Sequence, residues 1–212
     1  MDLLFIIALV VTSIIAVAFL IERGLALRWD KVIPPQVVTA VQNYNSARDL
    51  ARLQAICDHH PSPISRLLLF TMEHLDWPKN ETVEVLETRA KHEVTRLERG
   101  LVVLEIIVGI APLMGLVGTI YGLILLFAAT DLNAAGGTSE FSRGISLALR
   151  ATLLGLLIAI PALIGWSYYS RKVETLSIEM ESLCDEFLRK HYRIEESLPG
   201  GEQERVTRLK TH

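Results

Sequence analysis

The sequence is poor in the residues that build disulfide-bonded, nucleic-acid-binding or enzymatic sites. Only two cysteines, Cys57 and Cys184, occur in 212 residues, and two distant thiols exclude a disulfide framework. The net charge of −3 offers no basic surface to nucleic acid. No nucleophile stands with a base, and no glycine loop fits a phosphate, so we expect no enzymatic activity and no cofactor. We also expect no metal, because Cys57, His59 and His60 lack a partner pair at zinc-finger spacing and fit a polar helix end before Pro61.

Charged residues are also missing from three long apolar stretches. They cover residues 3–21, 106–129 and 144–167, the last interrupted only by Arg150. About 20 apolar residues cross a bilayer as a helix, and a helix satisfies its own backbone groups in lipid. The first stretch lacks the basic start and small-residue cleavage site of a signal peptide, so we expect an uncleaved anchor. The sequence thus predicts transmembrane helices over 1–22, 101–129 and 144–168.

The basic residues predict the orientation of these spans. They lie after the first span, before the second and after the third. The N-terminal tail has none, and the loop after the second span has one. Because cytoplasmic flanks are enriched in lysine and arginine, we expect a periplasmic N-terminus and a cytoplasmic C-terminus. The remaining segments are predicted as a cytoplasmic helical domain over 23–100, a periplasmic loop over 130–143, a cytoplasmic helix over 169–195 and a disordered tail over 196–212.

Helical patterns continue beyond two of the spans. Prolines divide the region before residue 79 into short helical segments near 36–45, 47–58 and 64–75. From Asn80, an N-cap by type, apolar residues recur at spacings of three and four as far as Leu104. This pattern predicts one helix that runs into the second span, and a similar stripe extends the third. The expected fold is an all-α membrane protein with three transmembrane helices, long cytoplasmic helical extensions and its N-terminus outside.

Small residues form one stripe on each of the last two spans, at spacings of three and four. They permit close approach of helix backbones in lipid. Packing within one bundle and room for a foreign helix at the centre of a ring both remain open. Pro112 and Pro161 each remove a backbone hydrogen bond, which indicates either a kink or a carbonyl beside a polar path. The stripes consist of Ala111, Gly115, Gly118 and Gly122 in the second span, and Ala148, Thr152, Gly155, Ala159 and Ala162 in the third.

Polar side chains inside the spans are few. Thr119 and Thr152 lie nearest the middle, while Glu105 and Arg150 lie near the membrane edges, where either charge could extend to the surface. A threonine can orient a proton or a water molecule but does not titrate near neutral pH. If this chain conducts protons, the titrating group at the middle should therefore come from another protein.

The motifs of the last two spans resemble those of the MotA/TolQ/ExbB proton channel family. The resemblance lies in residues 111–122, in residues 145–162 and in Glu22-Arg23 after the first span. ExbB and TolQ are closer than MotA, which has four spans. The resemblance implies a homopentamer in the bacterial inner membrane around the paired transmembrane helices of an ExbD- or TolR-like partner, whose aspartate takes the protons. It also implies that Thr119 and Thr152 face the pore and that aspartate, and that Pro161 is the third-helix proline of the family.

One position departs from this pattern. ExbB and TolQ carry a glutamate where this chain has Leu147, and the nearest charge here is Arg150. Arg150 could pair with a carboxylate of the partner, stabilise the outer mouth or reach lipid phosphates. The expected function is a proton-driven channel or motor subunit that works on the cell envelope, and the alternative is a non-conducting scaffold for a single-span partner. The envelope process that it serves is not encoded in this chain.

Overall fold

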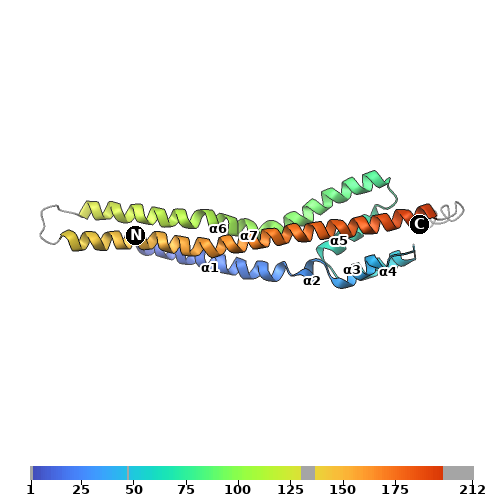
Figure 1. Cartoon of the computed structure of the whole chain (residues 1–212), viewed down its shortest axis with the longest axis horizontal. Helices are drawn as coiled ribbons and strands as arrows, with labels where there is room; N and C mark the ends of the chain where they lie inside the picture. The colour runs from blue at the N-terminus through green and yellow to red at the C-terminus, as the bar shows by residue number, and fades with distance from the viewer. Residues whose placement is uncertain (1, 47, 130–136, 198–212) are drawn as a thin grey trace. The chain divides into compact units, whose positions relative to one another are not determined.

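Every regular element in the described residues, which are 2–46, 48–129 and 137–197, is an α-helix in the computed structural model (Figure 1). The predicted all-α class is confirmed. Helices α1, α6 and α7 are long and apolar enough to cross a membrane, which confirms three candidate spans. The helices are α1 (Asp2–Ala26), α2 (Trp29–Val32), α3 (Pro35–Gln42), α4 (Asp49–His59), α5 (Pro63–Glu73), α6 (Lys79–Ala129) and α7 (Gly137–Ser197).

The chain divides into two compact units. The first, which we call the membrane unit, comprises Met1–Ala26 and Glu98–Arg171. The second unit comprises Leu27–Leu97 and Lys172–His212. Helices α6 and α7 contribute residues to both units, because each continues from an apolar span into an amphipathic extension, as the apolar spacing predicts.

Helix α6 begins one residue before the predicted cap. Pro78 starts the helix by accepting backbone hydrogen bonds from Glu81 at 2.9 Å and Thr82 at 3.1 Å. Proline has a fixed φ and no N–H, so it precedes or opens a helix readily. The assignment of Asn80 as the N-cap was therefore wrong: this residue lies within the first turn, since α6 starts at Lys79. Beyond this turn α6 runs for 51 residues through Pro112, and α7 runs for 61 residues through Pro161.

The membrane unit is held together mainly by small residues. Its buried cluster joins one residue of α1, two of α6 and two of α7. Alanine at most of these positions lets three helices meet with little side chain between them, which is the usual way that helices pack in lipid. The cluster consists of Ala16, Ile107, Ala111, Ala159 and Ala162, with Val103, Val108 and Ile158 packed against it.

Helix α1 meets α6 and α7 at further glycines. Leu20 packs against Gly165 of α7. The hydroxyl of Tyr169 lies against Gly24 and donates a hydrogen bond to the carbonyl of Leu20 at 3.0 Å. On the other side, the side chain of Arg23 lies against Gly100 of α6 and pairs with Glu22 at 2.6 Å. The end of α1 is therefore fixed to both other spans.

The second unit has a different kind of core, with buried polar groups between large apolar ones. Tyr44, which follows α3, is buried and bonds through its hydroxyl to Nδ1 of His191 at 2.8 Å. Lys190 donates to the carbonyls of Val41 at 3.1 Å and Gln42 at 2.6 Å, at the C-terminal end of α3. These contacts attach the short helix α3 to α7, and a cation suits the negative end of a helix dipole.

A buried carboxylate joins α5 to α6 in the same unit. Glu93 is completely buried, and its two oxygens accept from Arg66 at 2.5 Å and Arg96 at 3.1 Å. Both arginines are partly exposed, so solvent screens part of the attraction. The carboxylate is nevertheless paired on both oxygens, which is the condition under which a charge is tolerated in a core.

Candidate functional site

The last two spans contact each other through their backbones. A Cβ atom added to Gly155 would lie 2.6 Å from the carbonyl oxygen of Ala111 and 3.1 Å from the Cα of Gly115. A Cβ atom on Gly115 would in turn lie 2.9 Å from both the Ala151 carbonyl oxygen and the Thr152 Cα. These distances are too short for a side chain. The two stripes therefore contact each other within one chain, and α6 and α7 run antiparallel at this contact.

The two threonines lie at this seam but make different hydrogen bonds. Thr152 of α7 donates from its hydroxyl to the carbonyl of Gly115 on α6 at 3.3 Å. Thr119 donates to the carbonyl of Leu116 in its own helix at 2.6 Å. Thr119 lies four residues beyond Gly115, so it stands about 6 Å along α6 from the level where Thr152 packs. Each hydroxyl keeps acceptor capacity for a water molecule or a proton carrier.

The remaining small residues extend the seam in both directions. Gly118 meets the Cβ of Ala151, with 2.8 Å between that atom and an added Cβ. Gly122 is partly buried one turn further along α6. Ala159 and Ala111 belong to the three-helix cluster. Ala148 lies in α7, but its side chain is outside the described part of the structure.

Pro161 does not share a face with Thr152. The two residues are nine positions apart, or two and a half turns of α7, which places them on opposite sides of the helix. Pro161 is exposed, whereas Thr152 is partly buried against α6. The three residues expected on one proton path therefore divide between the seam and the outer side of α7.

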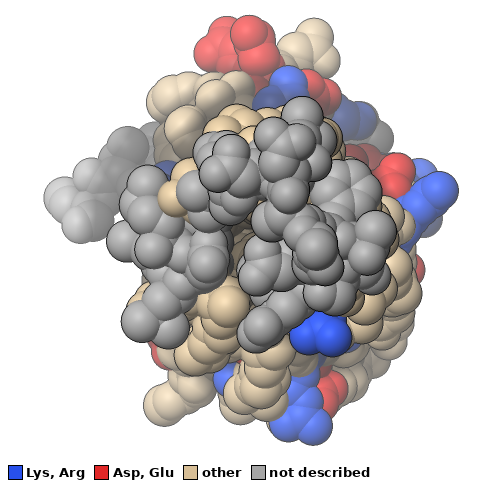
Figure 2. Space-filling model, turned by 90° about the vertical axis from the view of Figure 1, so that its left-hand side faces the viewer, with Lys and Arg blue, Asp and Glu red and all other residues tan. Residues whose placement is uncertain are grey.

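Both membrane-edge charges are exposed. Glu105 lies on α6 and Arg150 on α7. The side chain of Leu147, the position of the family glutamate, lies outside the described residues. Seen from the end at the left of Figure 1, the described residues are mostly uncharged, with basic and acidic groups around the rim (Figure 2).

Sequence reasoning missed three glycines at the contacts of α1 with α6 and α7. Gly24, Gly100 and Gly165 each lie against a larger side chain of another helix. Each stands near a span end, outside the regular stripes, so spacing alone did not select it. A search for glycines at span ends opposite leucine, tyrosine or arginine would have found these positions.

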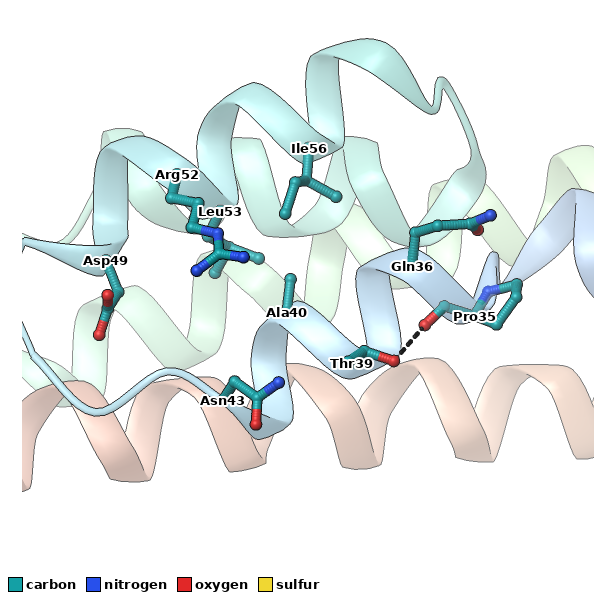
Figure 3. Close-up of a pocket in the computed structure, with 9 residues that line it drawn as sticks. All are labelled: Pro35, Gln36, Thr39, Ala40, Asn43, Asp49, Arg52, Leu53 and Ile56. Atoms are coloured by element: carbon teal, nitrogen blue, oxygen red, sulfur yellow. Dashed lines mark hydrogen bonds between the residues drawn. The ribbon is translucent and has the colours of Figure 1, made fainter.

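The second unit contains a hollow of mixed polarity between α3 and α4 (Figure 3). Its volume is about 410 Å³. Hydrogen bonds from the Ser46 hydroxyl and from the Asn45 backbone N–H hold the pKa of Asp49, at its rim, below the usual range. Within the described residues, no group of three or more histidine, cysteine or acidic side chains could hold a metal ion. The hollow is lined by Pro35, Gln36, Thr39, Ala40, Asn43, Asp49, Arg52, Leu53 and Ile56.

Comparison with known proteins gives a consistent result. The model of the MotA/TolQ/ExbB proton channel family matches residues 59–182. A putative biopolymer transport protein ExbB-like 1 of Synechocystis is 34% identical over 166 residues, which are 74% of this chain and 63% of that protein. The biopolymer transport protein ExbB of Aquifex aeolicus is 32% identical over 113 residues, 53% of this chain and 76% of that protein. The Tol-Pal system protein TolQ of Haemophilus influenzae is 28% identical over 140 residues, 66% of this chain and 55% of that protein. The chain thus spans less than two thirds of the Synechocystis and Haemophilus relatives.

Proposed function

This chain belongs to the MotA/TolQ/ExbB proton channel family, and we propose that it is one subunit of a proton-driven channel or motor that works on the cell envelope. The observation that carries the proposal is the α6–α7 seam. There Thr152 and Thr119 place two hydroxyl groups within helices that otherwise approach through glycine and alanine. Hydroxyl groups at membrane depth are costly without partners, and their usual role is in a polar path or a helix contact.

The proton-accepting carboxylate of this proposal belongs to a partner. Residues 106–129 and 151–167 contain no acidic residue, so the chain itself offers no titrating group at the middle of these spans. A single-span protein of the ExbD or TolR type supplies an aspartate opposite Thr119 and Thr152. Five copies of this chain surround the paired helices of that partner. The role of the chain is non-catalytic, and it requires no cofactor.

The proposed setting is the bacterial inner membrane. The N-terminus and residues 130–143 face the periplasm, because lysine and arginine concentrate on the other flanks of the spans. The helical domain 23–100 and the α7 extension 169–195 then lie in the cytoplasm. In this orientation the work is delivered through the partner on the periplasmic side.

The test is proton flux into acid-challenged liposomes that contain the chain with its genomic single-span neighbour. Thr152→Val keeps the shape of the side chain and removes the hydroxyl, and we expect at least a tenfold loss of flux with assembly intact. Thr119→Val should act in the same direction. Thr12→Val is the matched control, because Thr12 of α1 also donates to a backbone carbonyl, that of Ala8 at 2.8 Å, and is expected to change flux less than twofold.

A non-conducting scaffold is the second candidate, favoured by the same close packing of α6 on α7. It predicts that valine at either threonine is tolerated, since valine matches threonine in volume. Wild-type complexes that assemble but pass no protons would favour the scaffold. Equal losses in Thr12→Val and Thr152→Val would show that the hydroxyls act through stability alone.

A further inference from the structure

Glu105 is the single charged residue between positions 100 and 129 of the sequence. It lies in the uninterrupted helix α6, between the buried Leu104 and the exposed Ile106. Its side chain is exposed in the membrane unit. An ionisable group so close to a transmembrane stretch is costly and therefore calls for a role.

Glu105 shares one face of α6 with a glycine, a proline, a leucine and a threonine. Their spacings are four, three, four and three, which keeps them within a narrow stripe of an α-helix. The seam residues Ala111 and Gly115 are turned about 100° away from the middle of this stripe, so most of the stripe does not pack on α7, and Thr119 lies at its edge nearest the seam. The stripe, which we call the Glu105 face, consists of Glu105, Gly109, Pro112, Leu116 and Thr119.

Gly109 differs from the other glycines of the membrane unit. An added Cβ atom would meet nothing within 4 Å at Gly109, whereas each of the other six glycines with described surroundings has a close neighbour. Packing within the chain therefore does not explain why this position lacks a side chain. The missing side chain instead uncovers the backbone one turn from Glu105.

Pro112 adds an acceptor at the same place. Proline has no N–H, so it cannot bond to the carbonyl four residues earlier, that of Val108. This carbonyl precedes the uncovered Gly109. Further along the same face, the hydroxyl of Thr119 bonds to the carbonyl of Leu116 at 2.6 Å. The Glu105 face thus carries a carboxylate, an open backbone position, a carbonyl freed by proline and a hydroxyl, in that order.

We propose that Glu105 is a proton-carrying residue at the end of the proton path, on the side where α6 leaves the membrane unit. This inference rests on the proposed function. The carboxylate accepts a proton from water ordered along the Glu105 face and releases it to water beyond the span, returning to its charged form. One proton moves for each cycle, and no other bond changes.

Other charged groups at this end of the membrane unit lie outside the apolar stretch. None of these groups belongs to the Glu105 face, and Glu22 and Arg23 pair with each other. Glu105 is therefore the acid closest to Thr119 along the helix. These groups are Glu22 and Arg23 of α1, Glu98 and Arg99 of α6, and Arg171 of α7.

The first test compares Glu105→Gln with Glu98→Gln in the liposome assay. Glu98 is the matched control, because it lies seven residues earlier on the same side of α6 and is also exposed, but it does not adjoin the apolar stretch 106–129 as Glu105 does. We expect at least a tenfold loss of flux in Glu105→Gln, partial flux in Glu105→Asp and less than a twofold change in Glu98→Gln. Wild-type flux in Glu105→Gln, or an equal loss in Glu98→Gln, would overturn the inference and leave Glu105 as a surface charge near lipid head groups.

The second test separates this inference from the proposed function. Dicyclohexylcarbodiimide modifies protonated carboxyl groups in apolar surroundings, and mass spectrometry locates the adduct in the purified chain. We expect modification of Glu105 in preference to Glu98. If the wild-type complex passes no protons, the motor proposal fails, and this labelling still decides whether Glu105 takes up protons. Absence of labelling at Glu105 would refute the proposal that Glu105 carries protons.

Discussion

Gly155→Ala is the sharpest probe of the α6–α7 seam. The new Cβ would lie 2.6 Å from the carbonyl oxygen of Ala111, and ordinary van der Waals contact begins at 3.4 Å. The obstacle is backbone rather than a flexible side chain, so the helices must separate by about 0.8 Å at this level. A gap of that size forfeits about a quarter to a half of the dispersion energy of the contacts around it. Together with the strain, we expect a loss of about 1–3 kcal/mol in the free energy of unfolding.

The assay is unfolding of the purified chain in mixed micelles titrated with SDS, followed by circular dichroism. Gly109→Ala is the matched control, because it makes the same substitution in a span where nothing lies within 4 Å. Alanine has the higher helix propensity by about 1 kcal/mol in water, so this control should be neutral or stabilising. A Gly155→Ala chain as stable as Gly109→Ala would refute the reasoning that backbone contact holds the seam.

Three further predictions concern the second unit. Glu93→Gln removes the negative charge that Arg66 and Arg96 share and should lower the free energy of unfolding by about 1–3 kcal/mol in the same SDS titration. A change below about 0.5 kcal/mol would show that the two ion pairs contribute no net stability. Lys190→Met removes the side-chain donor to the carbonyls of Val41 and Gln42, of which Val41 keeps the backbone N–H of Tyr44 at 3.2 Å, and should cost about 1–2 kcal/mol. The exposed neighbour Arg189→Met should cost much less, and equal losses would contradict the capping role. Burial raises the pKa of the Cys57 thiol from 9.0 to about 11, so iodoacetamide at pH 8 should modify it about 100-fold more slowly in the folded chain than after SDS unfolding. Because the pKa of the Cys57 thiol is higher in the folded chain than in the unfolded chain, its contribution to stability is present below about pH 9 and is lost between about pH 9 and 11. Equal alkylation rates in the folded and unfolded chains would contradict the raised pKa.

The helical fold was predictable because lipid imposes a simple rule on sequence. Charge is rare in the spans, where Glu105 and Arg150 lie near the membrane edges, and further charged residues such as Arg23 and Glu98 lie just beyond the span ends. The spacing of apolar residues after Lys79 likewise predicted that α6 continues as one helix, since a helical face has a fixed period. The start of α6 was misplaced, because the turn chemistry of Pro78 outweighed the cap preference of Asn80.

The contacts between helices were less predictable. The stripes showed which faces of the last two spans permit close approach, but the same spacing suits a neighbouring copy or a partner. The contact of Tyr169 with Leu20 joins residues 149 positions apart and depends on one hydroxyl and one carbonyl. The spacing of apolar residues does not predict such hydrogen-bonded pairs, because it shows only which face of a helix is buried. The division of Thr152 and Pro161 between opposite sides of α7 follows directly from their spacing and was available from the sequence.

Contact through main-chain atoms also constrains how this protein can diverge. Where Gly155 meets the Ala111 carbonyl, the contacting atoms are the same in every amino acid, so relatives can change their outer residues freely without altering the seam. A deletion of one residue between Ala111 and Gly115 would turn one of these positions by about 100° relative to the other and remove it from the contact. The seam should therefore keep glycine at positions 115 and 155, where an added Cβ atom would meet backbone, and insertions or deletions should be excluded from it.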